Sequence, residues 1–180
     1  MNIETTPLKD VLILTPAVFK DDRGYFFESF NQQKIADFIK CKFVQDNESL
    51  SQKNVLRGLH FQIPPFAQDK LVRVIKGSVL DVAVDIRKSS PTYGQHFSIV
   101  LSGDNKKQLF IPAGFAHGFL TLEDHTIFSY KCSNYYEKSA EQTILWNDNS
   151  LNIEWNCNQP LLSDKDLIGE VFSTFESPFN

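Results

Sequence analysis

The sequence lacks the patterns that mark disulfide-bonded, secreted and membrane proteins. Its three cysteines, Cys41, Cys132 and Cys157, are odd in number and form no C-x-x-C pair. This usage favours reduced thiols in a cytoplasmic protein. The first residues show no basic segment followed by an apolar one, so no signal peptide is expected. No apolar run is long enough to span a bilayer, so no membrane association is expected.

Several enzyme motifs are also missing. The chain has no G-x-G-x-x-G, no phosphate-binding P-loop and no G-x-S-x-G. Dinucleotide, P-loop and nucleophile-elbow chemistry are therefore not supported. The histidines His60, His96, His117 and His125 never fall at H-x-H or H-x-x-x-H spacing, so a metal site would need ligands from distant segments. We expect neither a metal nor an organic cofactor.

Excess positive charge is absent too. The formal net charge is −4 at pH 7 and the isoelectric point is about 5.5, which argues against nucleic-acid binding. An anionic ligand would need a local cluster of cations rather than the field of the whole protein. With 180 residues, 42% of them hydrophobic, the chain is long enough for one domain with a substantial core. We expect a single domain over residues 1–180.

The dominant pattern is an alternation of apolar and polar residues with period two. It indicates short strands, including a half-buried strand over residues 80–86 that follows a turn at residues 76–78. Many short strands separated by turn residues are typical of an all-β sandwich or jelly roll. Further strands are expected at residues 70–75, 97–101, 108–111, 119–122 and 126–132.

Two short helices interrupt this pattern. Residues 32–39 form the clearer candidate, with Asn31 as N-cap and Ile35, Phe38 and Ile39 on one buried face. A second helix is expected to begin after Ser163, where acidic residues enrich the first turn. The predicted architecture is all-β with a few short peripheral helices.

His60 lies among apolar residues in the segment L-R-G-L-H-F-Q, residues 56–62. Histidine has the side-chain pKa nearest neutrality, so it is the first candidate for a general base. A lone strand histidine is more commonly a structural residue, so its role depends on its partners. Arg57 lies three residues earlier and would face the opposite side of a regular strand, unless Gly58 hosts a bulge.

Other polar residues lie in strands or beside glycines. Tyr130 shares the inward face of its predicted strand with Phe128 and Cys132, and a buried phenol needs a partner. His117 stands between two glycines, either as a ligand contact or as a loop histidine bonded to a carbonyl. Arg23, Arg57 and Lys70 could hold phosphate or negative charge, although surface ion pairs are the common alternative.

Taken in order, seven segments resemble the dTDP-4-dehydrorhamnose 3,5-epimerase family, and the resemblance covers nearly the whole chain. It implies a cupin-type jelly-roll homodimer that needs no metal or cofactor and acts on a dTDP-linked 4-keto-6-deoxy sugar. The segments that carry it are residues 22–28, 43–47, 56–62, 68–73, 111–119, 130–132 and 162–166.

The resemblance also implies a role for each matching residue. His60 would be the general base with Asp166 as its partner, Tyr130 the acid on the opposite face of the sugar, and Lys70 the cation near the C4 oxygen. The residues implied to contact the nucleotide, diphosphate or sugar are Arg23, Glu28, Gln45, Asp46, Asn47, Arg57, Lys70, His117, Glu141 and Lys165.

The chemistry explains these residue types. The C3 and C5 hydrogens of a 4-keto sugar are acidified by the carbonyl, so a base on one face can form an enolate and an acid on the other can return a proton with inversion. Positioned proton transfer contributes about 10² to 10⁴ in rate, so stabilisation of the enolate oxygen should matter as much. The alternatives are an epimerase that inverts only C3 or only C5, and a non-catalytic cupin that binds a sugar.

Overall fold

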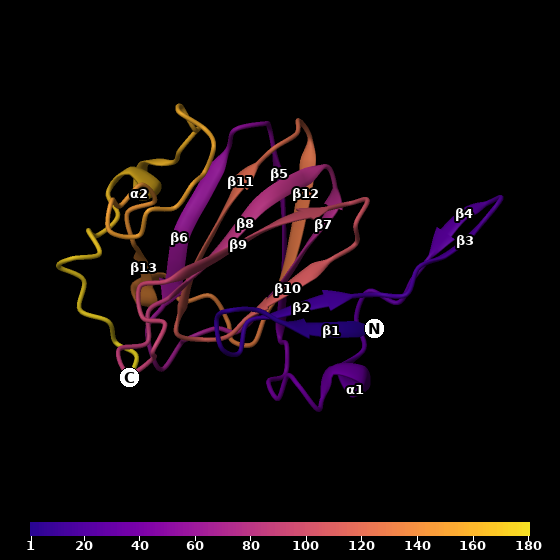
Figure 1. The fold of residues 1–180 in the computed structure, drawn as a ribbon, viewed down its shortest axis with the longest axis horizontal. Coiled ribbons are helices and arrows are strands. Elements are labelled where there is room, and N and C mark those ends of the chain that lie inside the picture. Colours follow the sequence, from indigo (N-terminus) through magenta and orange to yellow (C-terminus); the bar gives the residue numbers. More distant parts are fainter.

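The computed structural model describes residues 1–180, and two antiparallel β-sheets that face each other form its centre (Figure 1). This sandwich confirms the predicted all-β fold. The six-stranded sheet has the order β1 (Asn2–Thr5), β2 (Leu12–Thr15), β10 (Gln108–Ile111), β7 (Lys70–Lys76), β12 (Thr126–Cys132) and β5 (Gln45–Ser51). The five-stranded sheet has the order β13 (Glu141–Thr143), β6 (Leu56–Gln62), β11 (Phe115–Thr121), β8 (Ser78–Asp85) and β9 (His96–Ser102).

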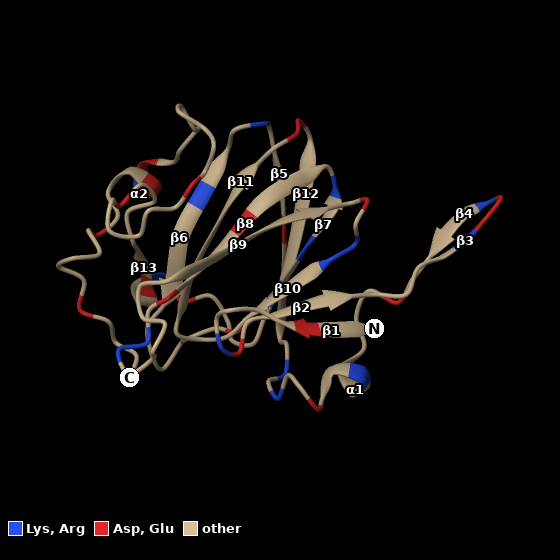
Figure 2. Ribbon diagram, in the orientation of Figure 1, with Lys and Arg blue, Asp and Glu red and all other residues tan.

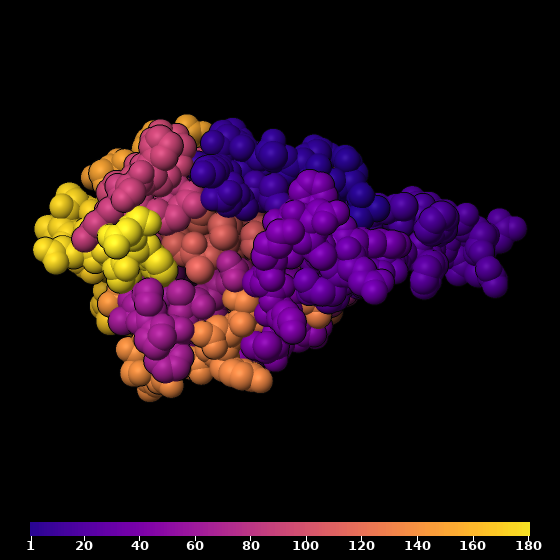
Figure 3. Space-filling view, turned by 90° about the horizontal axis from the view of Figure 1, so that it is seen from below, coloured from indigo at the N-terminus to yellow at the C-terminus, as the bar shows by residue number.

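A hairpin of β3 (Phe19–Asp21) and β4 (Gly24–Phe26) stands apart from both sheets. Figures 1 and 3 show it extending away from the body of the molecule. Its aromatic side chains have little cover, with Phe19 65%, Tyr25 57% and Phe26 71% exposed. An arm this apolar and this exposed is typical of a surface that packs on another chain.

The core has three parts. The space between the sheets is filled by side chains from both, such as Val72 and Phe128 on one side and Ala83 and Phe119 on the other. A second cluster lies on the outer face of the five-stranded sheet, where Trp155 and other residues of the C-terminal segment cover it. A third packs α1 (Gln32–Ile35) on the six-stranded sheet. The five-stranded sheet is therefore covered on both faces.

Because the five-stranded sheet is covered on both faces, strand β8 lacks the solvent-exposed face that its sequence predicted. The alternation over residues 80–86 predicted one buried and one solvent face. In the structure, Ala83 faces the space between the sheets, whereas Val82 and Val84 pack under the C-terminal segment. Asp81 and Asp85 are fully buried, so the polar positions of this strand point into the protein and not into water.

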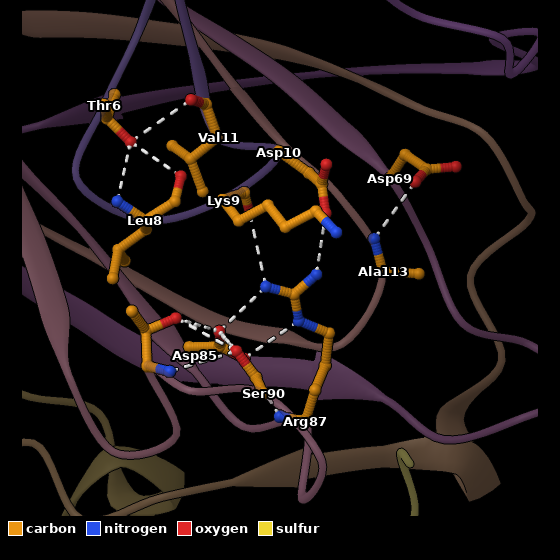
Figure 4. A network of polar contacts seen from close by, with 11 residues as sticks. Thr6, Leu8, Lys9, Asp10, Val11, Asp69, Asp85, Arg87, Ser90 and Ala113 are labelled. Atoms are coloured by element: carbon orange, nitrogen blue, oxygen red, sulfur yellow. Dashed lines mark hydrogen bonds and ion pairs between the residues drawn. The ribbon is translucent and has the colours of Figure 1, made fainter.

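Asp85 is satisfied by a local network shown in Figure 4. Its carboxylate accepts hydrogen bonds from Arg87 Nε at 2.9 Å and Nη2 at 2.8 Å, and from Ser90 Oγ at 2.6 Å. Arg87 also donates to the Lys9 carbonyl and pairs with Asp10 at 2.9 Å. The network connects the end of β8 to the loop between β1 and β2, two segments that are far apart in the sequence.

The predicted helices are present, and the first is shorter than expected. Asn31 Oδ1 accepts from the amides of Gln33 and Lys34, which confirms the N-cap, but α1 ends at Ile35 rather than residue 39. The chain then leaves the helix in a turn in which the Ile35 carbonyl accepts from the amides of Phe38 and Ile39. Phe38 points outward with 58% exposure, whereas Ile39 is buried as predicted. The second helix, α2 (Asp164–Leu167), begins after Ser163 as predicted.

Charge is distributed over the whole fold. Figure 2 shows acidic and basic residues interspersed along the ribbon, with both signs at the tip of the β3–β4 hairpin. Neither helix has the length or apolar content needed to cross a membrane. The three cysteines are all free.

Candidate active site

A cavity of about 500 Å³ opens between the two sheets. Both sheets and the C-terminal segment contribute polar side chains to its wall, whereas most of the space between the sheets is apolar. The five-stranded sheet supplies Arg57, His60, Gln62, His117 and Glu141; the six-stranded sheet supplies Gln45, Asn47, Ser49, Lys70 and Tyr130; and the segment around α2 supplies Ser163, Lys165 and Asp166.

His60 on β6 forms a buried pair with Asp166 on α2. The His60 Nε2 atom lies 2.7 Å from Asp166 Oδ1, and the aspartate side chain is 1% exposed. Burial lowers the pKa of His60, and the hydrogen bond to Asp166 opposes that shift. Burial alone would raise the pKa of Asp166, but hydrogen bonds from His60, Ser163 and Gly58 hold it at about 2. An ionised carboxylate keeps the proton on Nε2 and leaves Nδ1 as the free base.

A bulge in β6 allows Arg57 and His60 to reach the same cavity. His60 pairs with His117 and Arg57 pairs with Phe119, so three steps along β6 match only two along β11. The extra residue reverses the alternation of side chains, as the glycine had suggested. Arg57 then spans the sandwich, and its Nη2 donates to Ser51 Oγ on β5 at 3.3 Å.

Gly58 makes this bulge possible. Its φ is +134°, and a Cβ there would lie far inside van der Waals distance of the Gly118 Cα and 2.9 Å from the His117 carbonyl oxygen. We expect Gly58→Ala to lower the free energy of unfolding by about 3 kcal/mol or more, from backbone strain and overpacking together. Chemical denaturation of the variant measures this loss.

Gly24 provides the matched control for that variant. Its φ is +133°, but nothing lies within 4 Å of its Cβ position. Gly24→Ala therefore carries the backbone cost without the clash, and its loss should be about 1 to 3 kcal/mol. Equal losses in the two variants would contradict the close packing of β6 on β11.

Lys70 and Tyr130 line the wall opposite His60. Lys70 begins β7, which is anchored by Asp69. The Asp69 amide donates to Ser133 Oγ at 2.8 Å, and the Asp69 carboxylate accepts from the Ala113 amide at 3.0 Å (Figure 4). Burial lowers the pKa of Lys70. Burial also raises the pKa of Tyr130 to about 12, with the neighbouring Cys132 and Glu141 acting in the same direction. Tyr130 is therefore a protonated donor at neutral pH.

His117 forms a second histidine–aspartate pair in the same wall. It lies in the middle of β11 rather than in a loop, and its Nε2 is 3.0 Å from both oxygens of Asp81 on β8. The partner is thus a carboxylate and not the backbone carbonyl considered from the sequence. His117 lines the cavity while only 7% exposed.

Hydrogen bonds connect a series of side chains at the cavity mouth. Glu141 accepts from Lys165 Nζ at 2.8 Å and from the Tyr136 hydroxyl at 3.2 Å. The Tyr136 amide donates to Gln45, whose amide nitrogen donates to Asn47 at 3.0 Å. These contacts join β5, β13 and the segment of α2, so residues predicted as ligand contacts from distant segments meet here.

Three of the predicted ligand-contact residues do not line the cavity of this chain. Asp46 points to the outer face of β5, where it pairs with Lys131 at 2.9 Å, because neighbouring residues in a strand face opposite sides. Glu28 pairs with Lys34 near α1. Arg23 lies on the projecting hairpin and pairs with Asp21 at 2.5 Å.

Sequence reasoning missed two residues that support the histidines and one that lines the cavity. Asp81, the partner of His117, stood in a strand whose polar positions were assigned to solvent. Ser163 was identified only as a helix start, although it contacts Asp166. Tyr136, which lines the cavity and donates to Glu141, had no sequence signal of its own. The available signal for Asp81 was a carboxylate inside an otherwise apolar strand, which is costly unless it is paired.

The arrangement supplies the parts of a two-sided proton transfer. A base with a fixed tautomer stands on one sheet, and a protonated phenol and a lysine stand on the other. No group of three or more His, Cys, Asp or Glu side chains that could hold a metal ion is present. Arg57 and Lys165 at the cavity wall can bind anionic groups.

Comparison with known proteins points to one family. Residues 5–174 match the family described as dTDP-4-dehydrorhamnose 3,5-epimerase. The enzyme of that name from Shigella flexneri is 56% identical over 174 residues, which cover 96% of each chain. The structure of a dTDP-6-deoxy-D-glucose-3,5-epimerase from Legionella pneumophila in complex with dTDP-4-keto-L-rhamnose superimposes with a TM-score of 0.93 at 45% identity, covering 97% of this chain and 94% of that one. A 3′-monoepimerase from Streptomyces bikiniensis in complex with dTDP-quinovose is also similar, with a TM-score of 0.88 at 29% identity over 94% and 88% of the chains.

Proposed function

The chain belongs to the dTDP-4-dehydrorhamnose 3,5-epimerase family, and from this membership we propose that its cavity converts dTDP-4-dehydro-6-deoxy-D-glucose to dTDP-4-dehydro-L-rhamnose by inverting C3 and C5. The observation that carries the proposal is the placement of the His60–Asp166 pair on one wall and of Tyr130 and Lys70 on the other. Inversion at carbon requires proton removal from one face and return to the other.

His60 acts as the base in this proposal. It removes the proton from C3 or C5 through Nδ1, while Asp166 stabilises the imidazolium that forms. The electrons move onto the C4 oxygen, where the Lys70 ammonium stabilises the enolate. Tyr130 returns a proton to the carbon from the opposite face, which completes the inversion. An ammonium already held in place needs little reorganisation, so this stabilisation is large.

The cavity also fits the rest of such a substrate. Besides Lys70, the cations in the wall are Arg57 and Lys165, and we assign them to the diphosphate or sugar oxygens. His117, whose Nε2 faces Asp81, is assigned to a sugar hydroxyl. Gln45, Asn47 and Glu141 at the mouth offer hydrogen-bonding partners for the nucleotide.

Proton NMR of the product formed in deuterated water tests the proposal. We expect deuterium at both C3 and C5, with both centres inverted. Deuterium at one carbon only would identify a monoepimerase instead, an alternative favoured by the structural similarity to the 3′-monoepimerase. Binding without exchange at either carbon would identify a non-catalytic sugar-binding protein.

We further propose that the protein works as a homodimer in which the β3–β4 hairpin of one copy packs on the other. Three exposed aromatics on one short arm support this, together with the position of Arg23 in the turn between β3 and β4, outside the cavity of its own chain. Arg23 would then contact the ligand held by the second copy.

Substitutions on the β3–β4 arm distinguish its proposed role in dimer packing from the proposed contact of Arg23 with the ligand. Phe26→Ser should shift the mass measured by light scattering from dimer to monomer, because it removes the most exposed of these rings. Arg23→Ala should leave the dimer intact and raise KM by roughly tenfold, the loss expected for one charged hydrogen bond. An unchanged mass for Phe26→Ser and an unchanged KM for Arg23→Ala would both count against the arrangement.

A further inference from the structure

The carboxylate of Asp166 has more partners than a histidine-orienting group needs. Its Oδ1 accepts from His60 Nε2 at 2.7 Å and from the Gly58 amide at 3.1 Å. Its Oδ2 accepts from the Ser163 amide at 3.2 Å and from the Ser163 hydroxyl at 2.5 Å. One oxygen thus serves strand β6, and the other is held entirely by Ser163.

We propose that Ser163 is a positioning residue for the base, acting through Asp166. Its hydroxyl fixes Oδ2 and thereby sets the rotation of the carboxylate that points Oδ1 at His60 Nε2. This inference rests on the proposed function, because it assigns Ser163 to the machinery of the same site.

The hydroxyl is the contact that a side-chain substitution can remove. The Gly58 and Ser163 amides belong to the backbone and remain in any variant. The turn of α2 is also held by the bond from the Asp166 amide to the Ser163 carbonyl at 3.0 Å. Ser163 is also the N-cap of α2 and forms a capping box with Asp166, so loss of the hydroxyl weakens the cap, leaves these backbone bonds in place and frees the carboxylate to rotate.

The hydroxyl thereby controls the support that His60 receives. The hydrogen bond to Asp166 raises the pKa of His60 against the effect of burial, so a carboxylate that rotates away from Nε2 lowers that pKa. The charged or titratable groups around His60 are Asp166 and Lys165 near α2, Lys70 on β7, Glu141 on β13 and His117 on β11. Removal of a neutral hydroxyl alters none of these charges, so a change in the titration of His60 reports on Asp166.

Ser163→Ala tests the proposal. We expect kcat to fall by about tenfold, the loss typical of a hydrogen bond to a charged group. The acidic limb of the kcat/KM profile should move down by roughly half a pH unit, because a less basic His60 loses its proton at lower pH. Ser163→Thr keeps a hydroxyl and should restore both values. NMR titration of the His60 imidazole in the unliganded protein should show the same downward shift without relying on turnover.

Ser150→Ala is the matched control. Ser150 donates its hydroxyl to Asp148, a carboxylate 6% exposed that lies outside the cavity. It should lower stability to a similar degree and leave the pH profile unchanged.

The possible outcomes separate clearly. A Ser163→Ala enzyme with reduced stability and an unshifted His60 titration would make Ser163 a helix cap only. A rise in KM with the acidic limb in place would make it a substrate contact, and would also overturn the proposal. If the parent protein exchanges no sugar proton for deuterium, the proposed function fails, whereas the His60 titration still decides the role of Ser163.

Discussion

Replacement of His60 by alanine is expected to reduce turnover by about 10³ to 10⁴ while ligand binding changes little. The imidazole is the group with a free lone pair opposite Tyr130, and its Nε2 is committed to Asp166 at 2.7 Å. Its removal eliminates the base, so neither C3 nor C5 exchanges with solvent. The diphosphate and nucleotide contacts assigned to Arg57, Lys165 and the mouth residues remain. Stopped assays with NMR detection and calorimetric binding of dTDP measure the two effects separately.

His125→Ala serves as the control. His125 is an exposed loop residue beside Gln52, outside the cavity, so its loss should leave both measurements at the parent values. Residual activity of His60→Ala near that of the parent would remove His60 from the mechanism. An equal loss of binding and turnover would assign it to ligand affinity and leave the base unidentified.

The role of His60 depended on a local feature that the sequence indicated only in outline. A regular strand would have separated Arg57 and His60, and Gly58 suggested a bulge as the remedy. The register of β6 against β11 shows that bulge. The two glycines that permit it, Gly58 and Gly118, face each other across the strands, a pairing that depends on register and is not visible in either segment alone.

The period-two pattern predicted the positions of several strands correctly, but it did not predict what each face of a strand packs against. Residues 108–111 and 126–132 are strands with the expected limits. Asp81 was placed on a solvent face because alternation cannot distinguish water from a polar cavity inside a sandwich. That distinction depends on the C-terminal segment covering the other face of β8, which is a contact between residues far apart in the chain.

Tyr130→Phe is expected to separate exchange from inversion. The phenol, with a pKa raised to about 12 by burial, donates the proton that completes inversion, whereas His60 on the opposite wall forms the enolate. Without the hydroxyl, His60 can still remove a proton and return one to the same face. We therefore expect deuterium to enter the substrate with retained configuration, and formation of inverted product to fall by about 10² to 10⁴.

NMR of recovered substrate and product in deuterated water distinguishes these events, since one spectrum reports the deuterium content and the configuration at each carbon. Tyr93→Phe is the matched control, because Tyr93 packs on Phe172 at a centroid distance of 5.2 Å and lies outside the cavity. Equal losses of exchange and inversion in Tyr130→Phe would mean that the phenol is needed to form the enolate, and unchanged stereochemistry and rate would exclude it as the acid. Exchange with retention is the outcome that only a base and an acid on opposite sheets can produce, so this variant tests the architecture of the site as well as one residue.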